Sequence, residues 1–310
     1  MLFDFNNNRH KYREEFDEFP HIENHDFRFT KCICGNTRSY LISTVSRHRN
    51  FLPIVACSGC GTLRANPYFS EETAAHYYGQ VYGKVKREGR TPEQLFNEQR
   101  KKSLSPFLSE FKEEFSTVLD FGGGAGGKTS ELRSLGKSIS LHEVEGEYSQ
   151  FAYAQGILPY DSTLKYDLVV VSHVIEHMID PVTQMGEIVR DCCTENGLLL
   201  VATPIIDRQR SRQWLQHFHI AHKYYFTHDA LIGMMAALGC SLIHQNHKDA
   251  YLFKVGVDPD SDFVSSSYAK GAEKTRTLVE ADLKPSWRGM WNYLRNWRPH
   301  PHSPKSTIER

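Results

Sequence analysis

Residues 118–132 read VLDFGGGAGGKTSEL, a short apolar run that leads directly into a turn rich in glycine. A helical pattern follows the turn. Glycine adopts positive φ angles without strain and lets the backbone approach a ligand closely. The stretch therefore predicts a strand, a tight turn and a helix, with a ligand bound at the turn. The alternative is an ordinary tight connection between a strand and a helix.

Short apolar runs alternate with helical stretches from residue 118 onward. This alternation is typical of a parallel sheet that helices cover on both faces. The apolar residues after Pro181 share one helix face and stop near Gly197, and a further helix begins near Thr227. We expect an α/β fold with one doubly wound, seven-stranded, Rossmann-like sheet, whose strands are 118–121, 138–143, 157–160, 167–172, 197–202, 240–246 and 251–255.

As a bare pattern, the glycine-rich turn fits three ligand chemistries. The run GGGAGGKT matches G-x-x-x-x-G-K-T of a phosphate-binding P-loop, and Gly122, Gly124 and Gly127 match the dinucleotide pattern G-x-G-x-x-G. A P-loop nucleotidase needs an acid at the end of a later strand to hold magnesium, whereas YDLVVVSH has Asp167 at its beginning. Asp120 lies just before the glycines, where a carboxylate repels pyrophosphate and attracts a cation. The third chemistry, a cationic cofactor, is favoured.

The motifs around this turn resemble those of the class I S-adenosylmethionine-dependent methyltransferases. The first motif of that class is similar to Asp120-x-Gly122-x-Gly124-x-Gly126, and its fourth-strand motif is similar to residues 166–181, YDLVVVSHVIEHMIDP. The resemblance covers residues 118–255 and implies S-adenosylmethionine as the cofactor, with Glu143 accepting the ribose hydroxyl protons. The cofactor-binding residues that it implies are Asp120, Gly122, Gly124, Gly126, Glu143, Asp161 and Ser172; a solvated turn position is the alternative for Asp161.

His173, Glu176 and His177 follow the fourth strand, at the carboxyl edge where open α/β sheets bind ligands. Methyl transfer to a hydroxyl requires alignment of the nucleophile, the methyl group and the sulfur, and removal of a proton. These three residues are therefore candidate catalytic residues. Capping of the turn is the alternative. These residues also match the H-x-x-E-H pattern of one zinc-peptidase class, which needs both histidines on one helix face. Because His173 follows a strand, peptidase activity is disfavoured.

A second histidine group lies in residues 203–227, TPIIDRQRSRQWLQHFHIAHKYYFT. This segment resembles the Tyr-His-Glu-His-x-x-Tyr-Phe run of sugar C-methyltransferases, with His222 on the second histidine and Tyr225-Phe226 on the aromatic pair. Ala221 replaces the glutamate of that family and Ile220 its other histidine, so O-methylation of a sugar-like hydroxyl is favoured over ketosugar enolisation. His222 is the candidate base, and a structural, hydrogen-bonded histidine is the alternative. Two weaker candidates are His217 and His219.

Four of the seven cysteines form two close pairs, Cys32-x-Cys34-Gly35 and Cys57-x-x-Cys60-Gly61. Four thiolates can enclose a zinc ion tetrahedrally, and because no position stays open such a zinc is structural. A segment this short also needs a staple in order to fold. Free buried thiols are the alternative.

A zinc module ahead of a methyltransferase domain is a further resemblance to the sugar methyltransferases, as are the run Asn66-Pro67-Tyr68 and Tyr77. In that family such tyrosines cover the cofactor and the acceptor. The resemblance therefore implies cofactor contacts for Tyr78 and Tyr82, with helix packing as the alternative.

The chain divides into five expected segments: an N-terminal arm 1–30, a zinc-ribbon-like module 31–66, a helical linker or lid 67–115, an S-adenosylmethionine-binding domain 116–256 and a C-terminal tail 257–310. Thr91 is expected to cap a helix in the linker, with Pro92 in its first turn and Gln94 closing a capping box. In the tail, residues 284–298 place Trp287 and Trp291 on one helix face. Such a helix fits a membrane surface or a protein partner, or packs on its own domain.

The composition excludes some function classes. Lys+Arg 37 balance Asp+Glu 37, so no general attraction to nucleic acid is expected. No apolar run approaches the roughly 18 residues of a membrane-spanning helix, and we expect a cytoplasmic protein. The leading expectation is a methyltransferase that acts on a hydroxyl of a sugar, nucleotide sugar or glycan-related metabolite, with a histidine as base. The alternatives are a C-methyltransferase for a nucleotide-linked ketosugar and a non-catalytic zinc-ribbon adaptor that binds the cofactor.

Overall fold

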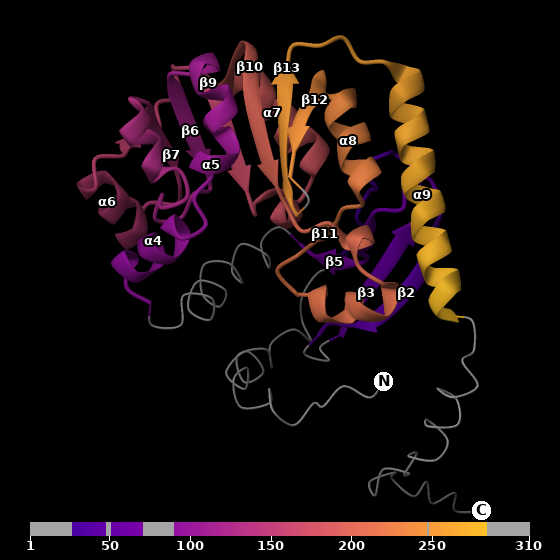
Figure 1. The fold of residues 1–310 in the computed structure, drawn as a ribbon. Helices are drawn as coiled ribbons and strands as arrows, with labels where there is room; N and C mark the ends of the chain where they lie inside the picture. Colours follow the sequence, from indigo (N-terminus) through magenta and orange to yellow (C-terminus); the bar gives the residue numbers. More distant parts are fainter. Residues whose placement is uncertain (1–26, 48–50, 71–89, 247, 284–310) are drawn as a thin grey trace, which may run out of the picture.

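The computed structural model describes residues 27–47, 51–70, 90–246 and 248–283 of the 310-residue chain (Figure 1). Its central element is a seven-stranded sheet of order β12-β13-β10-β9-β6-β7-β8, in which β13 is antiparallel to both of its neighbours and the strands from β10 to β8 are parallel. All seven predicted strands are confirmed; they are β6 (Thr117–Phe121), β7 (Ser138–His142), β8 (Leu158–Pro159), β9 (Tyr166–Ser172), β10 (Cys193–Ala202), β12 (Cys240–Gln245) and β13 (Ala250–Val255).

Both faces of this sheet are buried. Val169 and Val171 of β9 pack in one apolar cluster with residues of α7 (Pro181–Cys192) and α8 (His228–Ala237). The alternate residues Leu168 and Val170 pack in a second cluster, to which α4 (Pro92–Arg100), α5 (Ser105–Leu108) and α6 (Glu147–Ala154) contribute. A strand buried on both sides reads as a continuous apolar run, as YDLVVVS does, and the doubly wound architecture is confirmed.

The helix after the glycine-rich turn is shorter than the sequence pattern suggests. It is the 3₁₀ helix η4 (Ser130–Leu135), which ends at Gly136. The hydroxyls of Thr129 and Ser130 donate hydrogen bonds to the carbonyls of Gly126 and Gly127, at 3.4 and 2.9 Å. Because hydroxyls close to the backbone compete with helical hydrogen bonds, they favour a tighter turn here.

The cysteine-bearing region shares a sheet with a distant part of the chain. Its strands β2 (Ser39–Val45), β3 (Phe51–Cys57) and β4 (Leu63–Ala65) continue into β11 (Tyr224–Tyr225), which pairs antiparallel with β4. The Tyr68 hydroxyl donates to the carbonyl of Ile220 at 2.8 Å. Leu63, Trp214 and Phe218 belong to one apolar cluster. The cysteine region is therefore fastened to the segment that links β10 to α8, and the small pair β1 (Phe27–Arg28) and β5 (Tyr68–Phe69) lies beside it.

The C-terminal helix α9 (Ser261–Leu283) packs along α8 and reaches the cysteine region (Figure 1). The Thr275 hydroxyl donates to the carbonyl of Gly61 at 3.0 Å, and Lys274 forms an ion pair with buried Asp207 at 2.8 Å. The expected tail thus begins as a docked helix. The helix expected over 284–298 lies outside the described residues, as do Tyr77, Tyr78 and Tyr82.

The capping box of α4 is confirmed. Gln94 N donates to Thr91 Oγ1 at 3.2 Å, and Thr91 N donates to Gln94 Oε1 at 2.9 Å. Within the part of the chain that the structure covers, no helix is both long and apolar enough to cross a membrane.

Gly271 provides a test of the contact between α9 and the cysteine region. A Cβ atom there would lie 2.5 Å from Cys60 O and 2.9 Å from Thr227 Oγ1. We expect Gly271→Ala to lower the free energy of unfolding by about 1–3 kcal/mol, although alanine favours a helix. Urea denaturation measures this change.

Gly186→Ala in α7 is the matched control, because its Cβ would meet only Leu238 at an ordinary 3.5 Å. We expect this variant to equal or exceed the wild type in stability. A Gly271→Ala protein that is as stable as Gly186→Ala would contradict the packing described here.

Candidate functional site

The glycines of the turn between β6 and η4 are required by its backbone. Gly122, Gly124 and Gly126 have φ angles of 69°, 63° and 78°, in the region that favours glycine. Gly123 has no room for a side chain, because a Cβ there would lie 2.4 Å from the carboxyl carbon of Asp120. The turn therefore presents bare backbone to any ligand at the carboxyl edge of β6.

Gln99 of α4 clamps this turn, and sequence reasoning missed it. Its Nε2 donates to Gly123 O and its Oε1 accepts from Gly127 N, both at 3.0 Å. The capping box predicts where α4 begins, but it does not show which side chain of α4 contacts the glycine turn. No other sequence signal pointed to Gln99. Gln99 is a positioning residue for the turn.

Asp120 is a buried carboxylate with one unsatisfied oxygen. Its side chain is 1% exposed, Oδ2 accepts from Thr129 Oγ1 at 2.7 Å, and Oδ1 has no hydrogen-bond partner among the described residues. Burial raises the pKa of Asp120 to about 6. Ionising this carboxyl in the unliganded protein costs about 3 kcal/mol relative to the unfolded chain. A cation placed against Oδ1 would offset that cost.

Glu143 follows β7 and lies against the turn. Its Oε2 accepts from Gly124 N at 2.7 Å, so the ribose-binding position expected from sequence is in contact with the glycines. Asp161 instead lies on an exposed turn, where hydrogen bonds from Thr163 hold its pKa below the ordinary value. Asp161 therefore lies in a solvated turn, and its contact with the cofactor stays a prediction.

Lys128 joins the glycine turn to the end of β9. Its Nζ donates to Ser172 Oγ at 2.7 Å, and burial lowers the pKa of the ammonium group. Val174 touches the turn as well, because a Cβ on Gly122 would lie 2.6 Å from its Cγ2. The cofactor residues expected on β6 and those expected on β9 thus lie at one edge of the sheet.

Glu176 lies directly beyond β9, in the 3₁₀ turn η5 (Ile175–His177), and is 1% exposed. Its Oε2 accepts from Thr203 Oγ1 at 3.1 Å, and His173 Nδ1 lies 3.3 Å from Oε1. Burial opposes ionisation, but His173, His177 and His222, which lie around the carboxylate, lower the pKa of Glu176 to about 2. Glu176 is therefore a carboxylate at neutral pH.

His177 and His222 come together from segments that lie far apart in sequence. Their ring centroids are 4.7 Å apart, and one donor atom from each of His177, His222 and Glu176 lies within 4.8 Å of the other two. Two backbone contacts fasten the segments: Lys223 N donates to Glu176 O, and His177 Nδ1 to Ala221 O, both at 2.8 Å. We call Glu176, His177 and His222 the histidine–glutamate cluster.

The two weaker histidine candidates lie outside the cluster, although the ring centroid of His219 is 5.4 Å from that of His222. His219 Nδ1 accepts from Ala221 N at 3.0 Å, which fixes the backbone that carries His222. His217 forms a close contact with Gln209. Both fit a structural role.

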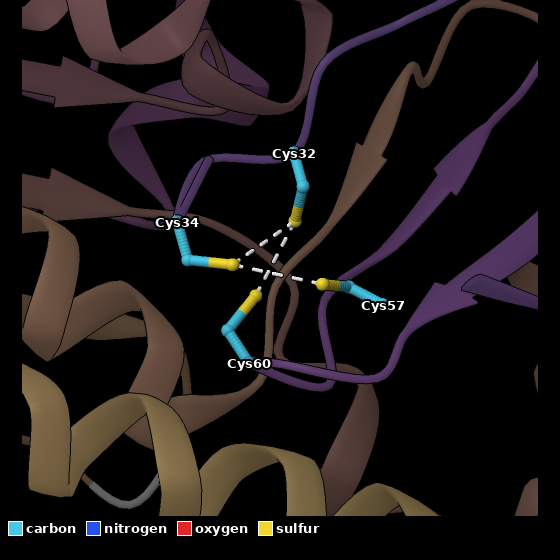
Figure 2. Close-up of side chains that lie close together, drawn as sticks. All are labelled: Cys32, Cys34, Cys57 and Cys60. Carbon is cyan, nitrogen blue, oxygen red and sulfur yellow. Dashed lines mark hydrogen bonds between the residues drawn. The ribbon is translucent and has the colours of Figure 1, made fainter. Parts of the chain in front are cut away.

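The four cysteines of the two predicted pairs converge (Figure 2). The Sγ–Sγ distances are 3.4 Å for Cys32–Cys60, 3.7 Å for Cys32–Cys34 and 3.6 Å for Cys34–Cys57. Thiolates around zinc lie about 3.8 Å apart when each Zn–S bond is about 2.3 Å. Gly59 N also donates to Cys57 Sγ at 3.3 Å. The donor set and its spacing fit a tetrahedral zinc ion.

Comparisons with known proteins agree with this architecture. Residues 96–245 match the family described as Methyltransferase domain. A search of curated protein sequences found no match.

Solved structures that resemble the chain include the 1,6-didemethyltoxoflavin N1-methyltransferase of Burkholderia thailandensis with bound S-adenosylhomocysteine. The two sequences are 15% identical and the TM-score is 0.47. The alignment covers 62% of this chain and 93% of that one. The pyocyanin biosynthetic protein PhzM is 13% identical, with a TM-score of 0.44 and coverage of 59% and 61%. Human N-acetylserotonin methyltransferase in complex with S-adenosylmethionine is 18% identical, with a TM-score of 0.42 and coverage of 59% and 62%. The chain thus spans about three fifths of the last two proteins.

The family match extends from α4 to the last residue of β12 and so includes the glycine turn, the end of β9 and His222. This match and the seven-stranded, doubly wound sheet identify residues 96–245 as a methyltransferase domain.

Proposed function

We propose that the enzyme transfers the methyl group of S-adenosylmethionine to a hydroxyl of a sugar, nucleotide sugar or glycan-related metabolite. The observation that carries this proposal is the histidine–glutamate cluster, which lies beyond the end of β9 at the edge that the glycine turn occupies. A hydroxyl must lose its proton during transfer, and an imidazole beside a carboxylate accepts protons readily. An amine or thiolate acceptor does not need such a base to the same degree.

The charges at the turn fit the amino-acid end of the cofactor. Asp120 has an unsatisfied oxygen for the ammonium group, and Lys128 supplies a cation for the carboxylate. Glu143, whose Oε2 lies 2.7 Å from Gly124 N, is placed to accept the ribose hydroxyls. The bare backbone at Gly122 and Gly124 allows the cofactor to lie against the turn.

The reaction follows from these positions. The acceptor oxygen attacks the methyl carbon in line with the sulfur, the carbon–sulfur bond breaks, and its electron pair stays on sulfur to give S-adenosylhomocysteine. His222 takes the hydroxyl proton. Glu176, which is buried beside His177 and His222, stabilises the imidazolium that forms.

Position 221 disfavours C-methylation of a ketosugar. Ala221 is fully buried and its carbonyl accepts from His177, so no carboxylate stands where the C-methyltransferases have glutamate. We therefore do not propose that a carboxylate at position 221 enolises a ketosugar. The non-catalytic adaptor hypothesis differs in predicting cofactor binding without turnover.

We also propose that the four cysteines hold a structural zinc ion, since their donor set leaves no open coordination position. Cysteines that bind zinc must stay reduced, and thiols stay reduced in a reducing compartment. This favours the cytoplasm as the location of the protein.

The raised pKa of Asp120 predicts a pH dependence of cofactor binding. Below about pH 6 the carboxyl is protonated and must release its proton to pair with the ammonium group. We therefore expect the affinity for S-adenosylhomocysteine to rise with pH between about 5 and 7, by up to about tenfold per pH unit, as calorimetry would show. Asp120→Asn should bind more weakly with a flat profile. An unchanged slope in this variant would refute the assignment.

Removal of the base should separate binding from turnover. We expect His222→Ala to keep its affinity for S-adenosylhomocysteine within about threefold and to lose about 10²–10⁴-fold in kcat, because only proton removal is affected. Mass spectrometry across candidate sugars and nucleotide sugars measures the methyl gain. His217→Ala, whose ring contacts Gln209 outside the cluster, is the control and should retain turnover. Equal activity in both variants would remove His222 from the mechanism.

Loss of one cysteine should release the structural zinc. We expect Cys57→Ser to lose one equivalent of zinc by metal analysis and several kcal/mol of unfolding free energy, because metal binding and folding are coupled. Cys240→Ser, on β12, is the control and should retain that zinc. Purified wild-type protein with no zinc, together with unchanged stability in Cys57→Ser, would show that the cysteines are free thiols.

A further inference from the structure

We propose that Glu176, His177 and His222 form a second metal site, distinct from the cysteine cluster, that binds a divalent transition-metal cation. One carboxylate and two imidazoles, with three donor atoms within 4.8 Å of one another, make up the site. Donors around a zinc-sized cation lie about 3–3.5 Å apart, since each metal–ligand bond is about 2.1 Å. A bound cation would draw these side chains inward by small torsional changes.

The ring of His177 is held as metal-binding histidines are held. Its Nδ1 donates to the carbonyl of Ala221 at 2.8 Å, so Nε2 is the nitrogen that would bind a metal. A histidine that binds a metal generally donates its other ring nitrogen to a carbonyl or carboxylate, which fixes the tautomer and orients the ring. The same carbonyl belongs to the residue before His222, so one backbone contact sets the positions of both rings.

Glu176 supplies the negative charge that a cation needs. The residue is 1% exposed, its Oε2 accepts from Thr203, and its Oε1 accepts no hydrogen bond of good geometry among the described residues, although His173 lies 3.3 Å away. A buried carboxylate with an unsatisfied oxygen is unfavourable unless a cation is placed against it. A metal at Oε1 is such a cation.

Within the described residues, carboxylates offset the positive charge of Lys128 near the cluster. Lys128 acts on Glu176, but it faces Asp120 and Asp249 as well. Asp249 Oδ2 also lies 3.8 Å from His173 Nε2. The carboxylates near the cluster therefore balance the lysine.

Two imidazoles and one carboxylate suit Zn²⁺, Fe²⁺ or Co²⁺ more than Mg²⁺ or Ca²⁺, which prefer oxygen ligands alone. The described residues supply three ligands here, whereas the cysteine cluster supplies four. We propose that an oxygen of the acceptor completes the coordination of the cation.

The role of this cation rests on the proposed function. A hydroxyl oxygen of the acceptor would occupy an open position, its pKa would fall, and its proton would pass to solvent water before the oxygen attacks the methyl carbon. In the metal-loaded enzyme the cation thus replaces His222 as the group that activates the hydroxyl. His177 and His222 remain essential, as ligands.

Cobalt titration of the metal-stripped full chain tests the site without any substrate. We expect two equivalents of Co²⁺ to bind, of which only one produces thiolate-to-cobalt charge-transfer absorption. His222→Ala and Glu176→Gln should weaken the equivalent without thiolate absorption about 100-fold or more. The thiolate signal of both variants should persist, which shows that they are folded. His217→Ala, as the control, should bind both equivalents.

A single equivalent with thiolate absorption in the wild type would overturn the proposal, as would retention of the second equivalent in both His222→Ala and Glu176→Gln. Calorimetry with S-adenosylhomocysteine on the cobalt-loaded protein, in which the cysteine cluster is filled, reports on the methyltransferase function separately. Cofactor binding without a second metal equivalent removes the metal site alone, whereas a second equivalent without cofactor binding removes the proposed function and leaves the metal site.

Discussion

The pairing of β4 with β11 joins the two parts of the molecule on which the site depends. Tyr224 and Tyr225 are opposite Arg64 and Leu63, so the segment between β10 and α8 becomes the edge of the cysteine region's sheet. Three residues before Tyr225, His222 is carried to the end of β9. A structural zinc in the cysteine cluster would therefore stabilise more than its own module, because the strands that it fastens also hold the segment that carries His222.

Buried charge is the second constraint. Asp120 and Glu176 are each 1% exposed, and each has a carboxylate oxygen that lacks a good hydrogen-bond partner within the described residues. One lies at the glycine turn and the other at the histidine–glutamate cluster, at neighbouring points of the same sheet edge. Burial of unsatisfied carboxylates is tolerated mainly where a ligand needs them. Our two proposals assign one of these oxygens to the ammonium group of the cofactor and the other to a metal cation.

Local patterns in the sequence predicted the sheet and much of the site. The strand YDLVVVS and the turn with positive-φ glycines at 122, 124 and 126 each depend on residues that are adjacent in sequence. A local sequence pattern therefore predicts them. The contacts of Gln99 with the turn, of β11 with β4, and of α9 with Gly61 join residues far apart along the chain. No local pattern encodes such contacts, so the sequence did not predict that the cysteine module shares a sheet with Tyr224 and Tyr225.

Methyl transfer itself is the most direct test of the account. S-adenosylmethionine with a trideuterated methyl group can be incubated with the enzyme and a panel of sugars, nucleotide sugars and glycan fragments, and the products examined by tandem mass spectrometry. The account predicts one trideuteromethyl group on an oxygen of the acceptor, with equimolar S-adenosylhomocysteine. Transfer to carbon or nitrogen, or no transfer to any member of the panel by protein that binds S-adenosylhomocysteine tightly, would contradict it.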